Sequence, residues 1–227
     1  MRLTGSNIGK YLDLSALKTD TTHADIARMA DLACQHRCAC VFVFTAHIPF
    51  LLEYLGPRRQ SLGLGGVVGF PTGSCSTGMK VKQTQELIEL GVDEVDMVQN
   101  VSWLKSGNPA AVEADIRAVV AAAGGKPVKV ILECHYLSDA EIAEACEIAI
   151  AAGVDYVKTG TGWAPTGATL DRVALMAETV AGRCKLKAAG GVRDRQTMEA
   201  MIDLGVTRFG IGVDTAVSIL KSVEDDG

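Results

Sequence analysis

The sequence has no long apolar run, no excess of basic residues and no apolar leader. Its longest apolar stretches, at 118–123 and 148–152, are far shorter than the roughly 20 residues that cross a bilayer. The opening residues, MRLTGSNIGKYLDLS, do not contain the continuous apolar stretch of a signal peptide, so we expect a cytoplasmic protein without a membrane segment. The formal net charge is −5 without any basic stripe, which argues against a nucleic-acid partner and favours a small molecule.

A disulfide framework is also missing. The 7 cysteines are an odd number, spread over a chain that is too long to need cross-links, so we interpret them as reduced thiols. His36, Cys38 and Cys40 are the one local group of metal-ligand residue types, but a second ligand pair is absent, so we predict a structural role and no metal. With 48% hydrophobic and 22% charged residues, the 227 residues should form a globular protein, and we expect one domain.

What the sequence does contain is a regular alternation of short β-branched runs and helical stretches. Strands such as ACVFVF (39–44), GGVVGF (65–70) and VKVILE (128–133) are almost continuously apolar, as expected when both faces of a parallel sheet are buried. The expected strand ends recur at intervals of roughly 20 to 35 residues, the length of one strand and one helix. These ends are Leu14, Phe44, Phe70, Gln99, Glu133, Thr159, Ala189 and Gly210.

Eight such units predict an α/β protein with the TIM (β/α)8 barrel fold, a single domain over 1–227. A short helix is expected before the first strand and a loose tail from about residue 222. The competing architecture is an open, doubly wound sheet, but units of even length give it no obvious switch point.

Two helices carry clear start signals. Ser138 stands three residues before Glu141, the spacing of a capping box, and Asn108 precedes Pro109, a residue suited to the first turn. Each of these runs ends at glycine, which favours helix termination.

Charged residues interrupt several apolar strands near their C-terminal ends, where barrels place functional groups. They are Asp96, Lys158 and Lys187, with Lys129 and Asp13 as further cases. Burial favours the neutral amine of a lysine, the form that attacks a carbonyl to give a Schiff base, and we predict Lys158 as the nucleophile. Lys187 on the neighbouring strand would keep Lys158 neutral by a repulsion of roughly 3 kcal/mol, about two pKa units. Asp96 would accept or relay the proton.

A structural salt bridge is the alternative explanation of these charges. The second lysine favours catalysis, because one carboxylate does not comfortably neutralise two buried ammonium groups.

Glycine-rich segments follow the last three expected strands, as TGTGWAPTGAT, GGVRD and GIGVD. Small residues let backbone N–H groups approach an anion, and barrels often bind phosphate at this corner, although glycines also serve plain turns. The candidate substrate-binding residues here are Thr159, Gly162, Gly190, Gly191, Gly210 and Gly212.

At these residues the sequence resembles the 2-deoxyribose-5-phosphate aldolase family, class I aldolases that use a lysine imine and no metal or other cofactor. The resemblance spans nearly the whole chain. It is carried by GVDEVDMVQN (91–100), VKVILE (128–133), AGVDYVKTGTGW (152–163), ATLDRVALM (168–176) and KAAGGVRD (187–194).

The resemblance implies reversible cleavage of 2-deoxy-D-ribose 5-phosphate to acetaldehyde and D-glyceraldehyde 3-phosphate. It makes Lys158 the Schiff-base lysine, Lys187 the lysine that perturbs it and Asp96 the proton relay. Asp13 and Lys129 match polar residues of the family pocket, and Gly162, Gly190 and Gly191 fall where the family binds phosphate through its backbone.

Two segments depart from the family pattern. A Cys-x-Asn/Tyr-Pro pattern after the second strand is replaced by Phe42 to Thr45, followed by Ala46 and His47. After the last strand, serine hydroxyls are replaced by Gly212, Val213 and Asp214. Asp214 would repel a phosphate unless it faces away at the first turn of the last helix, where a carboxylate is favourable.

Three hypotheses follow: this aldolase, the same imine chemistry on an unphosphorylated or different deoxy sugar, or a non-catalytic barrel that binds a sugar phosphate. His47 could contact substrate or be a loop residue, and Trp163 could cap the pocket or simply pack. The expected partners are a sugar phosphate and an aldehyde, and outer helices rich in Ala and Ile are compatible with a homodimer.

Overall fold

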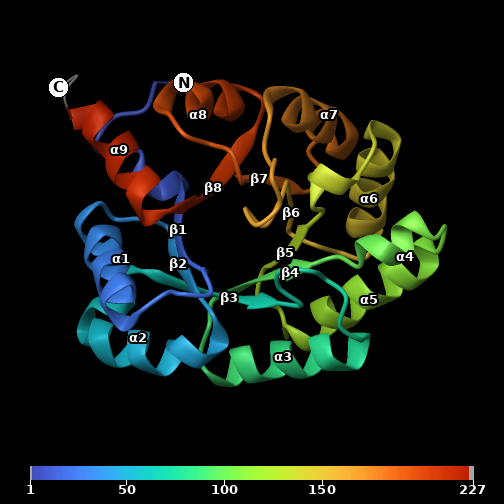
Figure 1. The fold of residues 1–227 in the computed structure, drawn as a ribbon, viewed down its shortest axis with the longest axis horizontal. Coiled ribbons are helices and arrows are strands. Elements are labelled where there is room, and N and C mark those ends of the chain that lie inside the picture. Colours follow the sequence, from blue (N-terminus) through green and yellow to red (C-terminus); the bar gives the residue numbers. More distant parts are fainter. Residues whose placement is uncertain (1, 225–227) are drawn as a thin grey trace.

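The computed structural model describes residues 2–224, which form a closed barrel of eight parallel strands inside a ring of helices (Figure 1). Each strand pairs with the next and β8 pairs with β1, so the predicted (β/α)8 barrel is confirmed and the open sheet is excluded. The strands are β1 (Leu12–Ala16), β2 (Cys40–Val43), β3 (Gly63–Val68), β4 (Glu94–Val98), β5 (Val128–Ile131), β6 (Tyr156–Lys158), β7 (Lys185–Ala189) and β8 (Val206–Gly212).

Helices follow the strands around the outside of the barrel. The α-helices are α1 (His23–Gln35), α2 (Ile48–Leu55), α3 (Thr77–Glu89), α4 (Val101–Lys105), α5 (Pro109–Ala122), α6 (Asp139–Ala151), α7 (Leu170–Val180), α8 (Arg195–Asp203) and α9 (Val213–Glu224). Short 3₁₀ helices lie at η1 (Gly9–Tyr11), η2 (Thr45–His47), η3 (Gly56–Ser61) and η4 (Cys134–Tyr136).

The predicted helix starts are confirmed. The Ser138 hydroxyl accepts from the Glu141 amide while the Glu141 carboxylate accepts from the Ser138 amide, a complete capping box. Asn108 caps α5 through the Ala111 amide, with Pro109 in the first turn. Such caps satisfy amides that the helix itself leaves unpaired.

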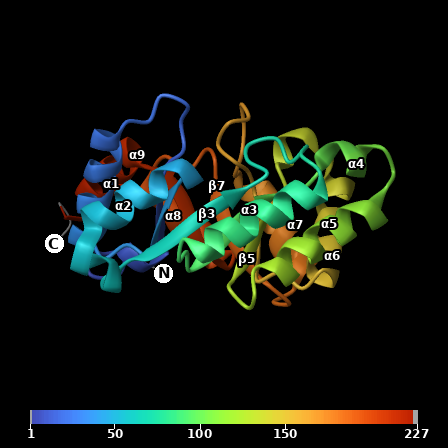
Figure 2. The same ribbon diagram turned by 90° about the horizontal axis from the view of Figure 1, so that it is seen from below.

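A buried ion pair joins α3 and α5, which lie side by side in both views (Figures 1 and 2). The Lys80 Nζ lies 2.5 Å from Asp115 Oδ2 and donates to the Val98 carbonyl at the end of β4, 2.9 Å away. Both side chains are 0% exposed, so this pair fixes two helices against one strand. No pattern in the sequence predicted this ion pair.

A short helix was expected before the first strand and a loose tail from about residue 222. The 3₁₀ helix η1 precedes β1, and helix α9 continues to Glu224, past the residue at which a loose tail was expected; residues 225–227 lie outside the described residues. Over residues 2–224, no helix combines the length and the apolar character needed to cross a membrane.

Strand β8 contains one extra residue relative to β7. Leu186 pairs with Val206 but Lys187 pairs with Arg208, so Thr207 is bulged out between them. A one-residue shift reverses the face to which every later side chain points. Beyond this bulge, Arg208 points into the barrel and the fully buried Phe209 packs in the outer hydrophobic core.

Candidate active site

Three predicted residues meet inside the barrel. Lys158 on β6 and Lys187 on β7 are register partners, and the Nζ atoms of both donate to the same oxygen of Asp96, Oδ2 on β4, each at 2.7 Å. All three side chains are at most 6% exposed. The expected proximity of the two lysines is therefore present, with a carboxylate directly between them.

A second layer of charges lies beside these residues. Asp13 Oδ2 is 2.6 Å from Lys187 Nζ, and the Asp13 Oδ1 atom accepts from Arg208 Nε at 2.6 Å. Arg208 also contacts Glu94 Oε1 at 2.8 Å, and Glu94 Oε1 lies 2.6 Å from Lys129 Nζ. These side chains form one continuous network, which we term the lumen cluster. Its members are Asp13, Glu94, Asp96, Lys129, Lys158, Lys187 and Arg208.

The lumen cluster shows that one expectation from the sequence, a single carboxylate for two buried lysines, was wrong. Lys158 and Lys187 do not depend on a single carboxylate, because Asp13 pairs with Lys187 as well. The excess of basic groups is nevertheless present in the cluster as a whole, which contains four basic and three acidic side chains. An uncompensated charge in a buried site is costly, so the cluster is electrically balanced when one basic group is neutral.

Lys158 is a basic member of the cluster whose pKa is brought toward neutral pH. Burial, opposed by Asp96 and reinforced by the charge of Lys187, lowers the pKa of its amine from the ordinary 10.5 to about 8. At pH 7 about a tenth of such amines are uncharged, roughly 300 times the fraction for an ordinary lysine. Lys187 therefore contributes as predicted, but desolvation is the larger cause.

Other members of the cluster remain charged. Burial alone would raise the pKa of Asp96, but Lys158, Lys187 and Lys129 bring that pKa far below its usual range. Burial alone would lower the pKa of Lys129, but Asp96, Asp13 and Glu94 together raise it well above that of a free lysine. Asp96 and Lys129 are therefore held in their charged forms beside the Lys158 amine.

An aromatic ring covers the cationic side of the cluster. Lys187 Nζ lies 4.0 Å from the centroid of the Phe42 ring, and Lys129 Nζ lies 5.2 Å from it, distances at which the ring face attracts a cation. Gly65 on the neighbouring strand makes room for this ring, because a Cβ there would lie 2.2 Å from a ring carbon.

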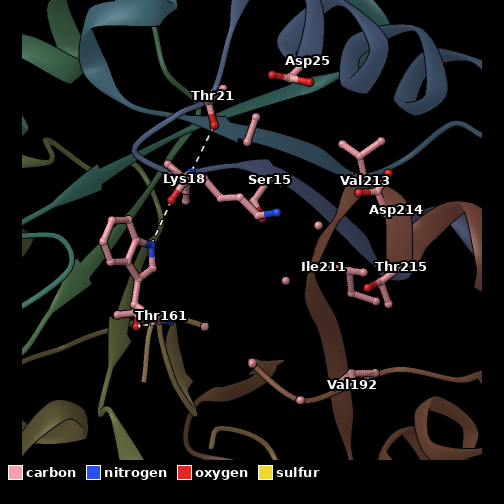
Figure 3. A pocket seen from close by; sticks show the side chains of 18 of the residues that line it. Ser15, Lys18, Thr21, Asp25, Thr161, Val192, Ile211, Val213, Asp214 and Thr215 are labelled. Carbon is pink, nitrogen blue, oxygen red and sulfur yellow. Dashed lines mark hydrogen bonds between the residues drawn. The ribbon is translucent and has the colours of Figure 1, made fainter. Parts of the chain in front are cut away.

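A cavity of about 460 Å³ opens at the C-terminal end of the barrel, and we term it the mouth cavity. Figure 3 shows Ser15, Thr161, Val192 and Ile211 around it, contributed by four different strand ends. Gly210 connects it to the lumen cluster: a Cβ at this position would lie 3.5 Å from Lys187 Cε and 3.8 Å from Lys158 Cε. The absence of a side chain at Gly210 leaves space above the two lysines.

Glycines line one wall of the mouth cavity, as predicted from the three glycine-rich segments. Gly162, Gly190 and Gly191 have φ angles of 84°, 75° and 110°, which other residues rarely adopt. Within residues 2–224, the amides of these three glycines donate to no protein acceptor. Unpaired backbone donors that converge on a cavity suit an anion.

The rim of the mouth cavity carries charges of both signs. Arg28 pairs with Asp214 at 2.9 Å, and both side chains are more than half exposed. Asp214 lies in the first turn of α9, and Figure 3 shows it at the edge of the cavity beside Val213. It therefore lines the cavity and is partly neutralised by Arg28. Lys18 and Arg193 add two cations to the lining, whereas Asp20 and Asp25 add two acids.

Several predicted site residues do not line the mouth cavity. The Thr159 hydroxyl is buried, donates to the Ala189 carbonyl at 2.8 Å and accepts from the Ala189 amide at 2.9 Å, so it joins β6 to β7 and is not free for substrate. Asp13 and Lys129 are 0% exposed and belong to the lumen cluster beneath the cavity. His47 lies outside the cavity lining, with its ring 5.6 Å from that of His23.

Glu94 and Arg208 were missed from the sequence. Glu94 stands two residues before Asp96 on β4, the spacing that places both side chains on one face of a strand, so the signal was present. Arg208 faces the barrel interior because Thr207 is bulged out, and the alternation of residue types along the strand does not predict a bulge.

Comparisons with known proteins concern the chain as a whole. The model of the DeoC/LacD family of aldolases matches residues 10–216. The chain is 41% identical to a deoxyribose-phosphate aldolase of Klebsiella pneumoniae, over 99% of this chain and 90% of the relative, and 45% identical to one of a Geobacillus species, over 95% and 96%. A tetrameric deoxyribose phosphate aldolase from Aeropyrum pernix superimposes with a TM-score of 0.88 at 25% identity, over 100% of this chain and 95% of that one. The chain belongs to the DeoC/LacD family of aldolases.

Proposed function

We propose that this chain is a class I aldolase that reversibly cleaves 2-deoxy-D-ribose 5-phosphate to acetaldehyde and D-glyceraldehyde 3-phosphate. The observation that carries the proposal is the lumen cluster, whose charges balance when Lys158 is an uncharged amine, directly beneath the floor of the mouth cavity at Gly210. The substrate is the one named for the relatives.

The reaction begins at Lys158. Its neutral Nζ attacks the aldehyde carbon of the open-chain sugar to form a carbinolamine, and loss of water gives a protonated imine. Asp96, which accepts hydrogen bonds from both lysines, supports the proton transfers of this step. The protonated imine carries a positive charge that the neutral amine lacks, so the charges of the cluster balance before the covalent step.

Cleavage then uses the imine as an electron sink. The hydroxyl on C3 loses its proton, the C2–C3 bond breaks, and its electron pair forms an enamine on Lys158 while C3 becomes the aldehyde of glyceraldehyde 3-phosphate. Protonation of the enamine at C2 and addition of water release acetaldehyde and restore the Lys158 amine. Lys187 stays paired with Asp13 and Asp96 through this sequence.

The proposal is tested by trapping the imine. Wild-type protein incubated with acetaldehyde and borohydride should gain an ethyl group on Lys158, located by peptide mass spectrometry. Lys158→Ala should gain none in the barrel and should lose retro-aldol turnover. A folded wild-type protein that cleaves no sugar and leaves Lys158 unmodified would contradict the proposal.

One observation favours a second candidate, the same chemistry on an unphosphorylated or differently charged deoxy sugar. Asp20, Asp25 and Asp214 line the mouth cavity, and Asp214 stands where serine hydroxyls are usual in the family. The ratio of kcat/KM for deoxyribose 5-phosphate to that for deoxyribose decides between the two. A large ratio supports the phosphorylated substrate, and a ratio near one supports the alternative.

We also propose a homo-oligomer acting in the cytoplasm. A tetramer is described for the Aeropyrum pernix relative, and a homodimer is what the Ala- and Ile-rich outer helices favour here. All seven cysteines are free, which suits a reducing compartment. Light scattering after size-exclusion chromatography measures the oligomeric state.

A further inference from the structure

Glu133, immediately beyond β5, has an unusual backbone. Its φ is 55° and its ψ is 59°, in the left-handed region that residues with a Cβ seldom adopt. Two other non-glycine residues among those described have a positive φ, Arg37 and Ala181, and both come at the ends of helices, where this conformation is common. Glu133 instead ends a barrel strand, and strain at such a place needs a compensating contact.

The compensating contacts are made by the side chain of Glu133, which is 5% exposed. Its two carboxylate oxygens lie 3.2 Å and 3.3 Å from the Thr161 amide, and one of them accepts from the Thr161 hydroxyl at 2.5 Å. Within residues 2–224 the Glu133 carboxylate forms no ion pair, so its interactions are these three contacts with Thr161. Both oxygens are thus used on one residue of the next βα loop.

The loop 160–163 forms a wall of the mouth cavity, and hydrogen bonds also hold its far end at Trp163. The Thr161 hydroxyl accepts from the Trp163 amide at 3.0 Å, and the Trp163 indole Nε1 donates to the Leu17 carbonyl at 2.9 Å, a bond drawn in Figure 3. Gly162 therefore stands between two anchored residues with its amide unpaired. Gly160 lets the carboxylate approach from behind, since a Cβ there would lie 2.8 Å from Glu133 Oε1.

We propose that Glu133 is a positioning residue for substrate recognition: from behind the loop 160–163, its carboxylate holds the conformation in which the Gly162 amide is presented to the phosphate of the substrate. This role rests on the phosphorylated substrate proposed above. A glutamine of the same shape would set an NH₂ group against the Thr161 amide or hydroxyl, because it has one acceptor oxygen where the carboxylate has two. Glu133 does not touch the reacting carbon atoms in this proposal.

The test compares Glu133→Gln with wild type on deoxyribose 5-phosphate and on deoxyribose. We expect KM for the phosphorylated sugar to rise by roughly 10- to 100-fold, the usual effect of losing hydrogen bonds to a charged group. The value of kcat should change by less than about threefold, and kcat/KM for deoxyribose should stay close to wild type. The Ki of inorganic phosphate as a competitive inhibitor should rise in parallel with KM.

Two further variants keep the test informative if Glu133→Gln folds poorly. Thr161→Val removes the hydroxyl that donates to Glu133 and should weaken phosphate recognition in the same way, whereas Thr161→Ser keeps the hydroxyl and should restore it. The matched control is Glu147→Gln, the same charge change on the outer helix α6, where Glu147 pairs with Arg183 in solvent. It should leave every one of these constants unchanged.

The outcomes separate this role from the substrate itself. A wild-type enzyme with no preference for the phosphorylated sugar overturns the phosphorylated substrate and, with it, the role of Glu133. A wild-type enzyme with a strong preference that Glu133→Gln and Thr161→Val both retain overturns the role of Glu133 alone. A fall in kcat that is equal for both sugars also overturns it, because that result would place Glu133 in the chemistry.

Discussion

The lumen cluster and the mouth cavity lie next to each other but are built by different means. The cluster consists of side chains from strands, buried and joined by ion pairs, so its properties follow from which residue occupies each strand position. The recognition wall of the cavity consists of loop backbone, where Gly162, Gly190 and Gly191 supply amides and no side chains. We therefore expect substitutions in the cluster to change kcat and its pH dependence, and substitutions in the cavity to change KM.

The largest effect is expected from Asp96→Asn. The amide keeps the shape but removes the charge that both lysines contact, so kcat should fall by roughly 10²- to 10⁴-fold with a smaller change in KM. Because Asp96 raises the pKa of Lys158, its loss should also move the acid limb of the rate profile to lower pH. Retained kcat, measured across pH, would remove Asp96 from the mechanism.

Lys187→Leu should move the acid limb of the rate profile to higher pH. The reactive form of Lys158 is the neutral amine, and Lys187 is one cause that lowers its pKa to about 8, so removing Lys187 raises that pKa. At pH 7 we expect a rate lower by roughly 10- to 100-fold, recovered at high pH, as follows from a shift of about one to two units.

The control for this variant is Lys185→Leu. Lys185 is an exposed lysine on the same strand, so it should leave the acid limb in place. Overlapping pH–rate profiles for wild type and Lys187→Leu would show that burial alone sets the pKa of Lys158.

Gly190→Ala tests the cavity side of the comparison. Its φ is 75° and an added Cβ would lie 3.2 Å from Gly162 Cα, so the two loops must move apart and their amides with them. We expect KM for the phosphorylated sugar to rise about tenfold with kcat nearly unchanged. Gly182→Ala is the matched control, because Gly182 has a φ of 76° and no heavy atom within 4 Å of an added Cβ. Equal kinetic effects of the two variants would argue against a recognition role for Gly190.

The smallest effect is expected from Asp214→Asn. Removing an exposed carboxylate at the rim should lower KM for the phosphorylated sugar by about twofold to threefold at low salt, and the difference should vanish as salt screens the charge. Stability should change little, since exposed pairs such as Arg28 with Asp214 contribute roughly 0–1 kcal/mol. An increase in KM would mean that Asp214 contacts the substrate favourably.

The sequence was sufficient for the barrel because the evidence for it is local and repeated. Apolar strands, capping residues such as Ser138 and Asn108, and regular spacing each depend on a few neighbouring residues. It was also sufficient to bring Lys158 and Lys187 together, because consecutive barrel strands are neighbours.

The sequence could not supply features that depend on exact backbone geometry. The unusual φ of Glu133 and its reach to Thr161 cannot be read from residue types. Thr159 was assigned to substrate binding together with the glycine-rich segment that it begins, but its hydroxyl is bonded to Ala189. The pairing of Asp13 with Lys187 needed the closure of β8 against β1, which sets distances between residues at opposite ends of the chain.

The bulge at Thr207 decides whether each later side chain of β8 points into the barrel or toward the helices. If Thr207 paired directly with Lys187, without the bulge, the remaining strand would turn by half a period. The Arg208 guanidinium would then point at the helices, and the ring of Phe209 would enter the space above the lysines that Gly210 now leaves open. A strand that lacks Thr207 altogether needs no bulge, because Arg208 would then follow Val206 directly and still pair with Lys187.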